Sequence, residues 1–172
     1  LRGALLEHHV LVFRNQSLTH EDQVRFAQWF GELQVHPFVE ASPHHPEVIE
    51  LITEADEAST FCGGWHADLT CLEAPVLGSL RYGVELPVVG GDTLFANQQA
   101  AYDALSAPMK NMLDGLGAVH SAGTQYAAGG SATSHSSMRT HNSERAMTRV
   151  VHPIVRTHPE SGRKGLFINE AY

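Results

Sequence analysis

The sequence has little cysteine and little basic charge for its 172 residues. Cys62 and Cys71 are its two cysteines, and they form no C-x-x-C pattern. This argues against a disulfide scaffold or a zinc ribbon and fits a reducing cytoplasm. Lys and Arg number 11 against 19 Asp and Glu, a formal charge of −8, and no basic run offsets it. Because such a field repels phosphate backbones, we expect no nucleic-acid partner.

Long apolar runs are also missing. The stretches "HVLVF" and "PVLGSL" fall far short of the roughly 20 residues that cross a bilayer. The first residues show no signal-peptide pattern, so we expect a cytoplasmic protein with no membrane partner. The chain starts without Met, and we expect it to begin inside a longer protein. The length suits one domain, and 42% hydrophobic and 17% charged residues are ordinary for a globular protein.

Histidine is the abundant residue, at 12 of 172, and imidazole is a common metal ligand. The stretch "GGWHADLT" (63–70) places His66 and Asp68 two residues apart. On an extended strand the two side chains share a face, opposite Trp65 and Ala67. With a second His they would form the facial triad of non-haem Fe(II) oxygenases. A simple His–Asp hydrogen bond at a strand edge explains the tripeptide as well.

The pattern along the chain predicts short strands beside grouped helices, which favours a β-sandwich or jelly-roll core. Thr19 caps a helix that ends at Gly31, and two short helices follow in 97–121, with Ser106 capping the second and Pro108 in its first turn. The predicted strands are 7–16, 46–53, 74–86, 92–96 and two around the turn "HPESG" near the C-terminus.

Residues 127–143 change abruptly in composition to Gly, Ser, Ala and Thr. A stretch of this length and composition is typical of a loop that closes over a site. We therefore predict a mobile lid there, outside the hydrophobic core.

Three longer stretches together resemble the taurine dioxygenase family of Fe(II)- and 2-oxoglutarate-dependent oxygenases. The central one is "WHADLTCLEAPVLGSLRYGVELPVVGGDTLFAN", with W-H-x-D before a Gly-Gly-Asp-Thr turn. The stretch from "LLEHHVLVF" to "GELQVHP" and the final "VVHPIVRTHPESGRKGLFINEAY" are similar to flanking family segments. The resemblance implies one partial oxygenase domain over 1–172. Its fold would be mainly β with flanking helices, a double-stranded β-helix (jelly roll) incomplete at the C-terminus.

The resemblance also implies roles for individual residues. His66 and Asp68 match two iron ligands, and Thr93 matches the Thr that helps to hold 2-oxoglutarate. His36 matches a residue that lines the substrate pocket, with a turn residue as the alternative. The family's third ligand, a distal His, and its 2-oxoglutarate-binding Arg are both expected beyond residue 172.

Two departures bear on the substrate. Where taurine-specific members have a Tyr and an Asn, this chain has Val39 and Cys62. Both are more apolar, so taurine would leave polar groups unmatched, and we expect a longer alkyl sulfonate, a sulfate ester or another apolar-tailed acid. Tyr126 and Tyr172 are candidates for an aromatic wall, with core or surface packing as the alternative.

The function implied is hydroxylation of a small sulfonate or similar acid with Fe(II), 2-oxoglutarate and O₂, releasing succinate and CO₂. Related halogenating enzymes lack the ligand carboxylate, because chloride needs its coordination position on the metal. Asp68 is present in this chain, so hydroxylation is favoured over halogenation. Two alternatives stay open: a non-redox jelly roll that binds zinc or manganese, and a family member without activity. We expect a homo-oligomer, either a dimer or a tetramer.

Overall fold

The computed structural model describes residues 1–57, 61, 63–135, 137–141 and 144–172. The chain divides into two compact units, which are described separately. Unit 1 consists of residues 1–17, 81–118 and 152–168, and unit 2 of residues 18–80, 119–151 and 169–172. Cys62 lies outside the described residues, so its predicted role has no structural counterpart here.

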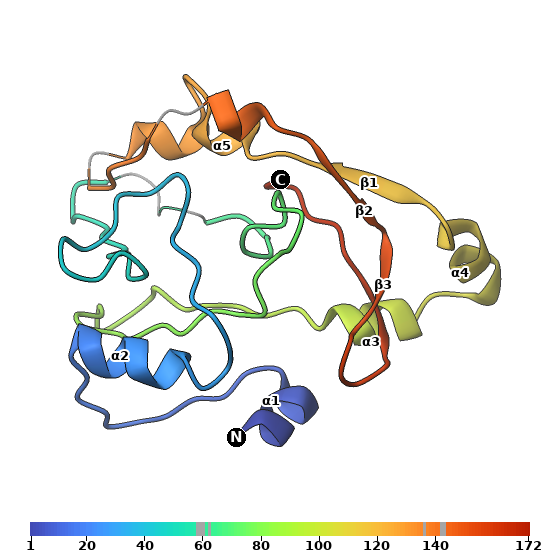
Figure 1. The fold of residues 1–172 in the computed structure, drawn as a ribbon, viewed down its shortest axis with the longest axis horizontal. Coiled ribbons are helices and arrows are strands. Elements are labelled where there is room, and N and C mark those ends of the chain that lie inside the picture. Colours follow the sequence, from blue (N-terminus) through green and yellow to red (C-terminus); the bar gives the residue numbers. More distant parts are fainter. Residues whose placement is uncertain (58–60, 62, 136, 142–143) are drawn as a thin grey trace. The chain divides into compact units, whose positions relative to one another are not determined.

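In the described part of the chain, helices come first and most of the strands come last, near the C-terminus (Figure 1). The helices are α1 (Arg2–His8), α2 (His20–Ala27), α3 (Gln98–Asp103), α4 (Ala107–Leu113), α5 (Gly123–Tyr126), and the 3-10 helices η1 (Ser131–Ser134) and η2 (Glu144–Met147). The strands are β1 (Gly117–His120), β2 (Val150–Pro153), β3 (Val155–Thr157) and β4 (Lys164–Leu166). β1 pairs with β2 and β3 with β4, which gives two two-stranded sheets in the described part of the chain.

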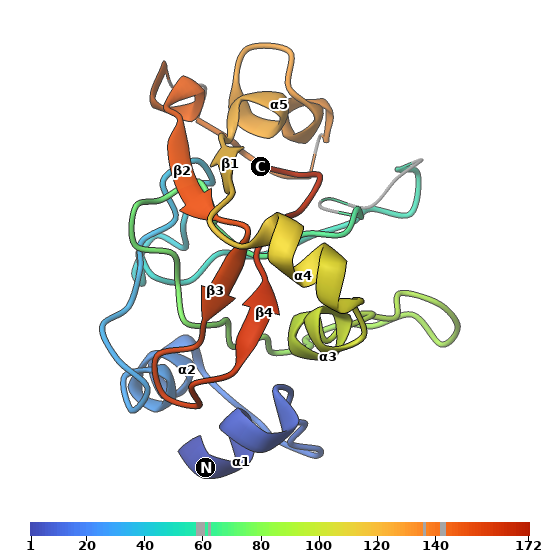
Figure 2. The ribbon, with the colours of Figure 1, turned by 90° about the vertical axis from the view of Figure 1, so that its right-hand side faces the viewer.

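In unit 1, helices α1 and α3 contact the antiparallel β3–β4 hairpin. Val155 pairs with Leu166 and Thr157 with Lys164, around the predicted "HPESG" turn. α3 packs against β4 (Figure 2). Arg2 of α1 donates to the Glu160 carboxylate at 2.7 and 2.8 Å, which ties that helix to the hairpin turn. The two predicted C-terminal strands are thus confirmed.

The predicted helix starts are confirmed. Thr19 and Asp22 form a reciprocal capping box at α2, and the Ser106 hydroxyl accepts from the Met109 amide at the start of α4. The predicted end of α2 is wrong. The helix stops at Ala27, and residues 28–30 form a turn before Gly31.

Four segments predicted as strands, 7–16, 46–53, 74–86 and 92–96, lie outside the assigned strands, and α1 extends into the first of them. A strand needs a hydrogen-bonded neighbour, and several apolar side chains of these segments face solvent instead. Val12, Val84 and Leu94 are 74%, 85% and 71% exposed. These four segments of the described chain therefore show no paired strands of a double-stranded β-helix, and the jelly roll and its incompleteness stay predictions.

The hydrophobic core lies in unit 2. Its buried residues are Phe38, Val39, Cys71, Ala122, Tyr126, Ala132, Met138 and Ala146. The expectation that 127–143 lies outside the core is wrong for Ala132 and Met138, because alanine and methionine in a polar-looking stretch still bury apolar surface. The lid itself stays a prediction.

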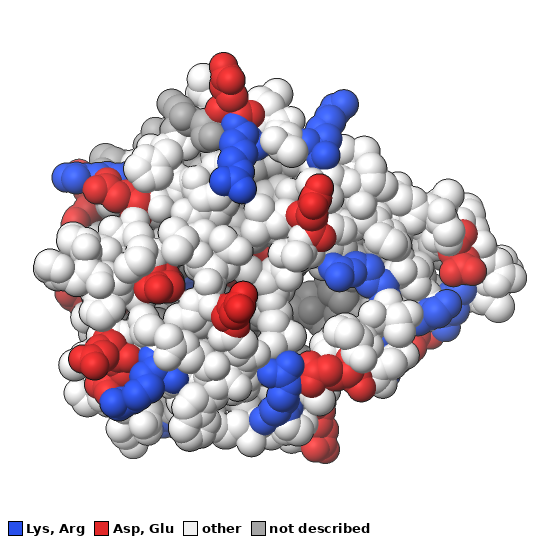
Figure 3. All heavy atoms as spheres, in the orientation of Figure 1, with Lys and Arg blue, Asp and Glu red and all other residues white. Residues whose placement is uncertain are grey.

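Acidic and basic side chains are interspersed on the face of the molecule shown in Figure 3. Among the described residues, no helix has the length and apolar character needed to span a membrane.

Candidate metal and substrate site

His66 and Asp68 meet, although their segment is not a strand. The Nε2 atom of His66 lies 3.3 Å from Oδ1 of Asp68. Residues 64–65 form a bend and residues 68–71 a turn. The two side chains therefore face the same way as predicted, but a turn brings them together rather than the alternation of an extended strand.

The His66 ring is oriented by its own chain. Its Nδ1 lies 2.8 Å from the Gly64 carbonyl oxygen, which can only accept, so Nδ1–H donates. The Nε2 atom then faces Asp68. A hydrogen bond from Nδ1–H to a backbone carbonyl is the usual way in which proteins fix a metal-binding histidine.

The spacing of the two donor atoms fits a common metal ion. Ligand atoms about 2.1 Å from a metal, on adjacent vertices of its coordination sphere, lie about 3 Å apart. The observed 3.3 Å between Nε2 and Oδ1 is close to this value. Within the described residues no cluster of three or more His, Cys, Asp or Glu side chains is arranged to hold a metal. The pair could therefore supply two ligands to a metal ion.

His36 is close enough to Asp68 for the carboxylate to act on its pKa, and the His36 ring is neutral. Its Nδ1 accepts from the backbone amides of Phe38 and Val39 at 3.2 and 3.0 Å, so the ring proton sits on Nε2. Burial lowers the pKa of His36 to about 4, although the Asp68 carboxylate acts in the opposite direction. His36 therefore offers a neutral N–H donor near the candidate metal pair.

Tyr126 packs behind His36 and is only 1% exposed. Its ring stacks on Phe38 at 5.0 Å and meets the His36 ring edge-on at 5.7 Å. In this structure Tyr126 is a core residue that packs against His36. Core packing was the alternative to an aromatic wall of the substrate pocket. Tyr172 is partly buried against the same core.

Thr93 belongs to unit 1, whereas His36, His66 and Asp68 belong to unit 2. It is exposed, and its Oγ1 accepts from the Arg81 guanidinium at 3.4 Å. Arg81 was not singled out from the sequence, because only proximity in space connects it with Thr93.

A His–Asp pair is two thirds of the facial triad of non-haem Fe(II) oxygenases. The sequence model of the taurine catabolism dioxygenase TauD, TfdA family matches residues 1–172, and the chain belongs to this family.

Individual relatives agree with this assignment. An alkylsulfatase from Acinetobacter baylyi is 32% identical over 100% of this chain and 54% of its own length. An alpha-ketoglutarate-dependent sulfate ester dioxygenase from Pseudomonas putida is 33% identical over 96% of this chain and 55% of its own. A taurine dioxygenase structure from Burkholderia xenovorans matches 98% of this chain and 52% of its own, with a TM-score of 0.68 and 31% identity. The chain spans about half the length of these relatives.

Proposed function

We propose that the protein is an Fe(II)- and 2-oxoglutarate-dependent dioxygenase that hydroxylates a small sulfonate, sulfate ester or similar acid. The observation that supports this best is the 3.3 Å separation of His66 Nε2 and Asp68 Oδ1, with the imidazole oriented by Gly64. Family membership and the relatives named above support the same reaction class.

Each residue of the site has a separate task. His66 and Asp68 hold the metal, and a further histidine is needed to complete a facial triad. When bound, Fe(II) with 2-oxoglutarate and O₂ supplies the oxidising power for hydroxylation, with succinate and CO₂ as the coproducts. The Thr93 hydroxyl would bind 2-oxoglutarate, and a lid role for residues 127–143 stays a prediction.

His36 binds the acidic group of the substrate. Its Nε2–H is a hydrogen-bond donor, and a neutral imidazole can lie beside Asp68 without protonating. Val39 follows closely and is apolar, which favours an alkyl tail over a charged one.

The test is substrate-dependent succinate release by the intact protein. We expect His66→Ala and Asp68→Ala to abolish this release, because each removes one of the two ligand atoms, while circular dichroism stays unchanged. His44→Ala, at an exposed position, is the control and should retain full turnover. Undiminished succinate release by either ligand variant would refute the assignment of the site. A wild-type protein that binds Fe(II) but releases no succinate would identify a family member without activity.

A further inference from the structure

The turn that follows Asp68 has an unusual backbone. Leu69 has φ of +52°, in the left-handed region that branched side chains rarely adopt. The turn closes where the Leu72 amide donates to the Leu69 carbonyl at 3.1 Å. The Asp68 side chain is 46% exposed, so packing constrains it little. The direction of its carboxylate therefore depends on what holds this turn in place.

Thr70 is the buried anchor of the turn. It is 1% exposed, and its hydroxyl meets two polar side chains from distant parts of unit 2. The Asn169 amide donates to Thr70 Oγ1 at 3.0 Å, and Nδ1 of His120 lies 2.9 Å from the same oxygen. His120 is also 1% exposed, at the end of β1.

The orientation of Asn169 is fixed independently. Its Oδ1 accepts from the backbone amides of Ala171 and Tyr172, both at 3.0 Å. The amide nitrogen must then face Thr70, so Thr70 Oγ1 is the acceptor of that bond. The network thus joins the turn to two segments that lie 50 and 99 residues away in the sequence.

We propose that Thr70, held by His120 and Asn169, is a positioning residue that aims the Asp68 carboxylate at the metal. This proposal rests on the proposed function, because it concerns the same metal site. Groups that orient a ligand without touching the metal typically change its affinity about 10- to 100-fold. A threonine hydroxyl two residues after the ligand can act in this way, since it fixes the backbone from which the carboxylate projects.

The test compares three variants of the intact protein. Thr70→Val keeps the shape of the side chain and removes both hydrogen bonds, whereas Thr70→Ser keeps the hydroxyl. Val48→Ala is the matched control, because Val48 is buried in the same unit and lies outside the network. Co(II) affinity is measured from the visible absorption of the bound ion, and hydrogen exchange of the Leu72 amide reports on the turn without any metal.

We expect Thr70→Val to weaken Co(II) binding about 10-fold or more and to speed Leu72 exchange relative to Val48→Ala. Thr70→Ser should stay within about threefold of the wild type, since its hydroxyl is retained. Wild-type Co(II) affinity in Thr70→Val, or an equal loss in Val48→Ala, would overturn the positioning role and leave the metal site standing. An intact wild-type protein that binds no Co(II) would overturn the metal site and the positioning role together.

Discussion

At the scale of single residues, His36 shows how burial sets the chemistry of the candidate site. Two backbone amides occupy its Nδ1, and burial lowers its pKa to about 4. A protonated imidazole would have to give up both amide bonds and lie charged in a largely buried position. The neutral form is therefore favoured even though Asp68 attracts the charged form.

This predicts that His36 makes the folded chain sensitive to acid. Between pH 6.5 and about 4 the unfolded chain binds a proton at His36 that the folded chain does not. Above pH 6.5, neutral His36 makes its full contribution to the free energy of unfolding. As pH falls from 6.5 to about 4, this free energy decreases by up to about 3 kcal/mol. We expect His36→Gln, which cannot protonate, to flatten the dependence of unfolding free energy on pH from 7 to 4.

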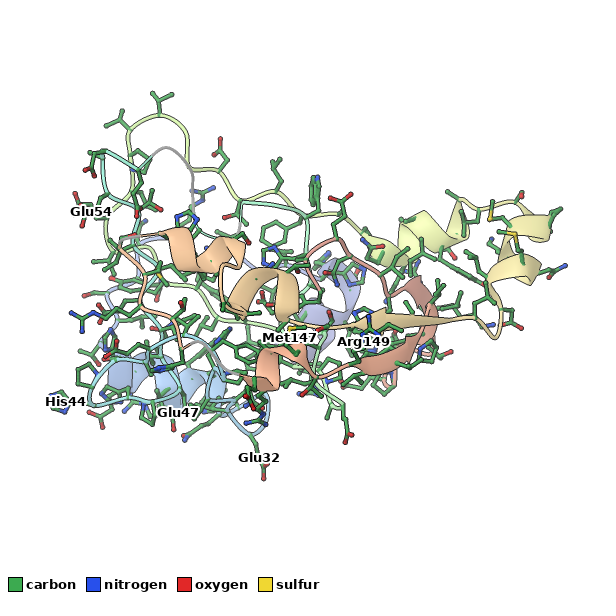
Figure 4. The ribbon with its side chains drawn as sticks, turned by 90° about the horizontal axis from the view of Figure 1, so that it is seen from above. Glu32, His44, Glu47, Glu54, Met147 and Arg149 are labelled. Carbon is green, nitrogen blue, oxygen red and sulfur yellow. The ribbon has the colours of Figure 1, made fainter. Side chains whose placement is uncertain are left out.

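Urea unfolding at several pH values measures this dependence. His44→Gln is the control, because His44 points away from the ribbon of its unit (Figure 4). The wild type and His44→Gln should lose stability in parallel. An identical slope in His36→Gln would show that His36 does not titrate abnormally.

The closeness of His66 and Asp68 could be predicted from the sequence, but their surroundings could not. The two residues are only two positions apart, so their side chains can meet on a strand or, as here, beside a turn. The bonds from Thr70 to His120 and Asn169 join distant segments. No local pattern encodes such contacts, because they depend on how the chain folds back on itself.

At the scale of secondary structure, helix caps were predicted correctly because capping is local. The Thr19 hydroxyl accepts from the Asp22 amide at 3.1 Å, and the Asp22 carboxylate accepts from the Thr19 amide at 3.1 Å. The hydrogen bonds from Thr19 hold the pKa of Asp22 below its usual range. Strands depend on a partner elsewhere in the chain, so the same sequence signals overpredicted them.

The capping box predicts a defined loss of stability. Thr19→Ala leaves an amide at the start of α2 without its acceptor and should lower the unfolding free energy by about 1 kcal/mol. Ser17→Ala, at an exposed position just before the helix, should change it by less than about 0.5 kcal/mol. Chemical denaturation of both variants checks this, and equal stabilities would show that the box does not hold the helix.

At the scale of the whole molecule, family membership supports the proposed reaction class, while this chain's own residues bear on the proposed substrate. The relatives with sulfate ester or sulfonate names are 33% identical to it over the aligned segments. The chain spans about half their length or less. The features that distinguish substrates must therefore be sought in particular side chains, and we propose Val39, which is buried in the core close to His36 in the sequence, as the first of these to test.

Substrate preference in the intact protein should follow the apolar tail of the acid. Taurine brings an ammonium group, and leaving it without a partner costs roughly 1–3 kcal/mol, or about 10- to 100-fold in kcat/KM. Ethanesulfonate has the same two-carbon chain without that charge, so comparison with taurine isolates the ammonium group. Each methylene added from ethanesulfonate to hexanesulfonate should raise kcat/KM up to about fourfold, because burial of a methylene contributes about 0.8 kcal/mol.

Succinate release across taurine, the alkanesulfonates and hexyl sulfate measures both effects. Hexyl sulfate against hexanesulfonate holds the tail constant and compares a sulfate ester with a sulfonate. The His36→Gln variant should lose activity with every acid alike, because His36 is proposed to bind the group that they all share. Taurine as the best substrate, or rates independent of tail length, would show that an apolar residue at position 39 does not shape the pocket.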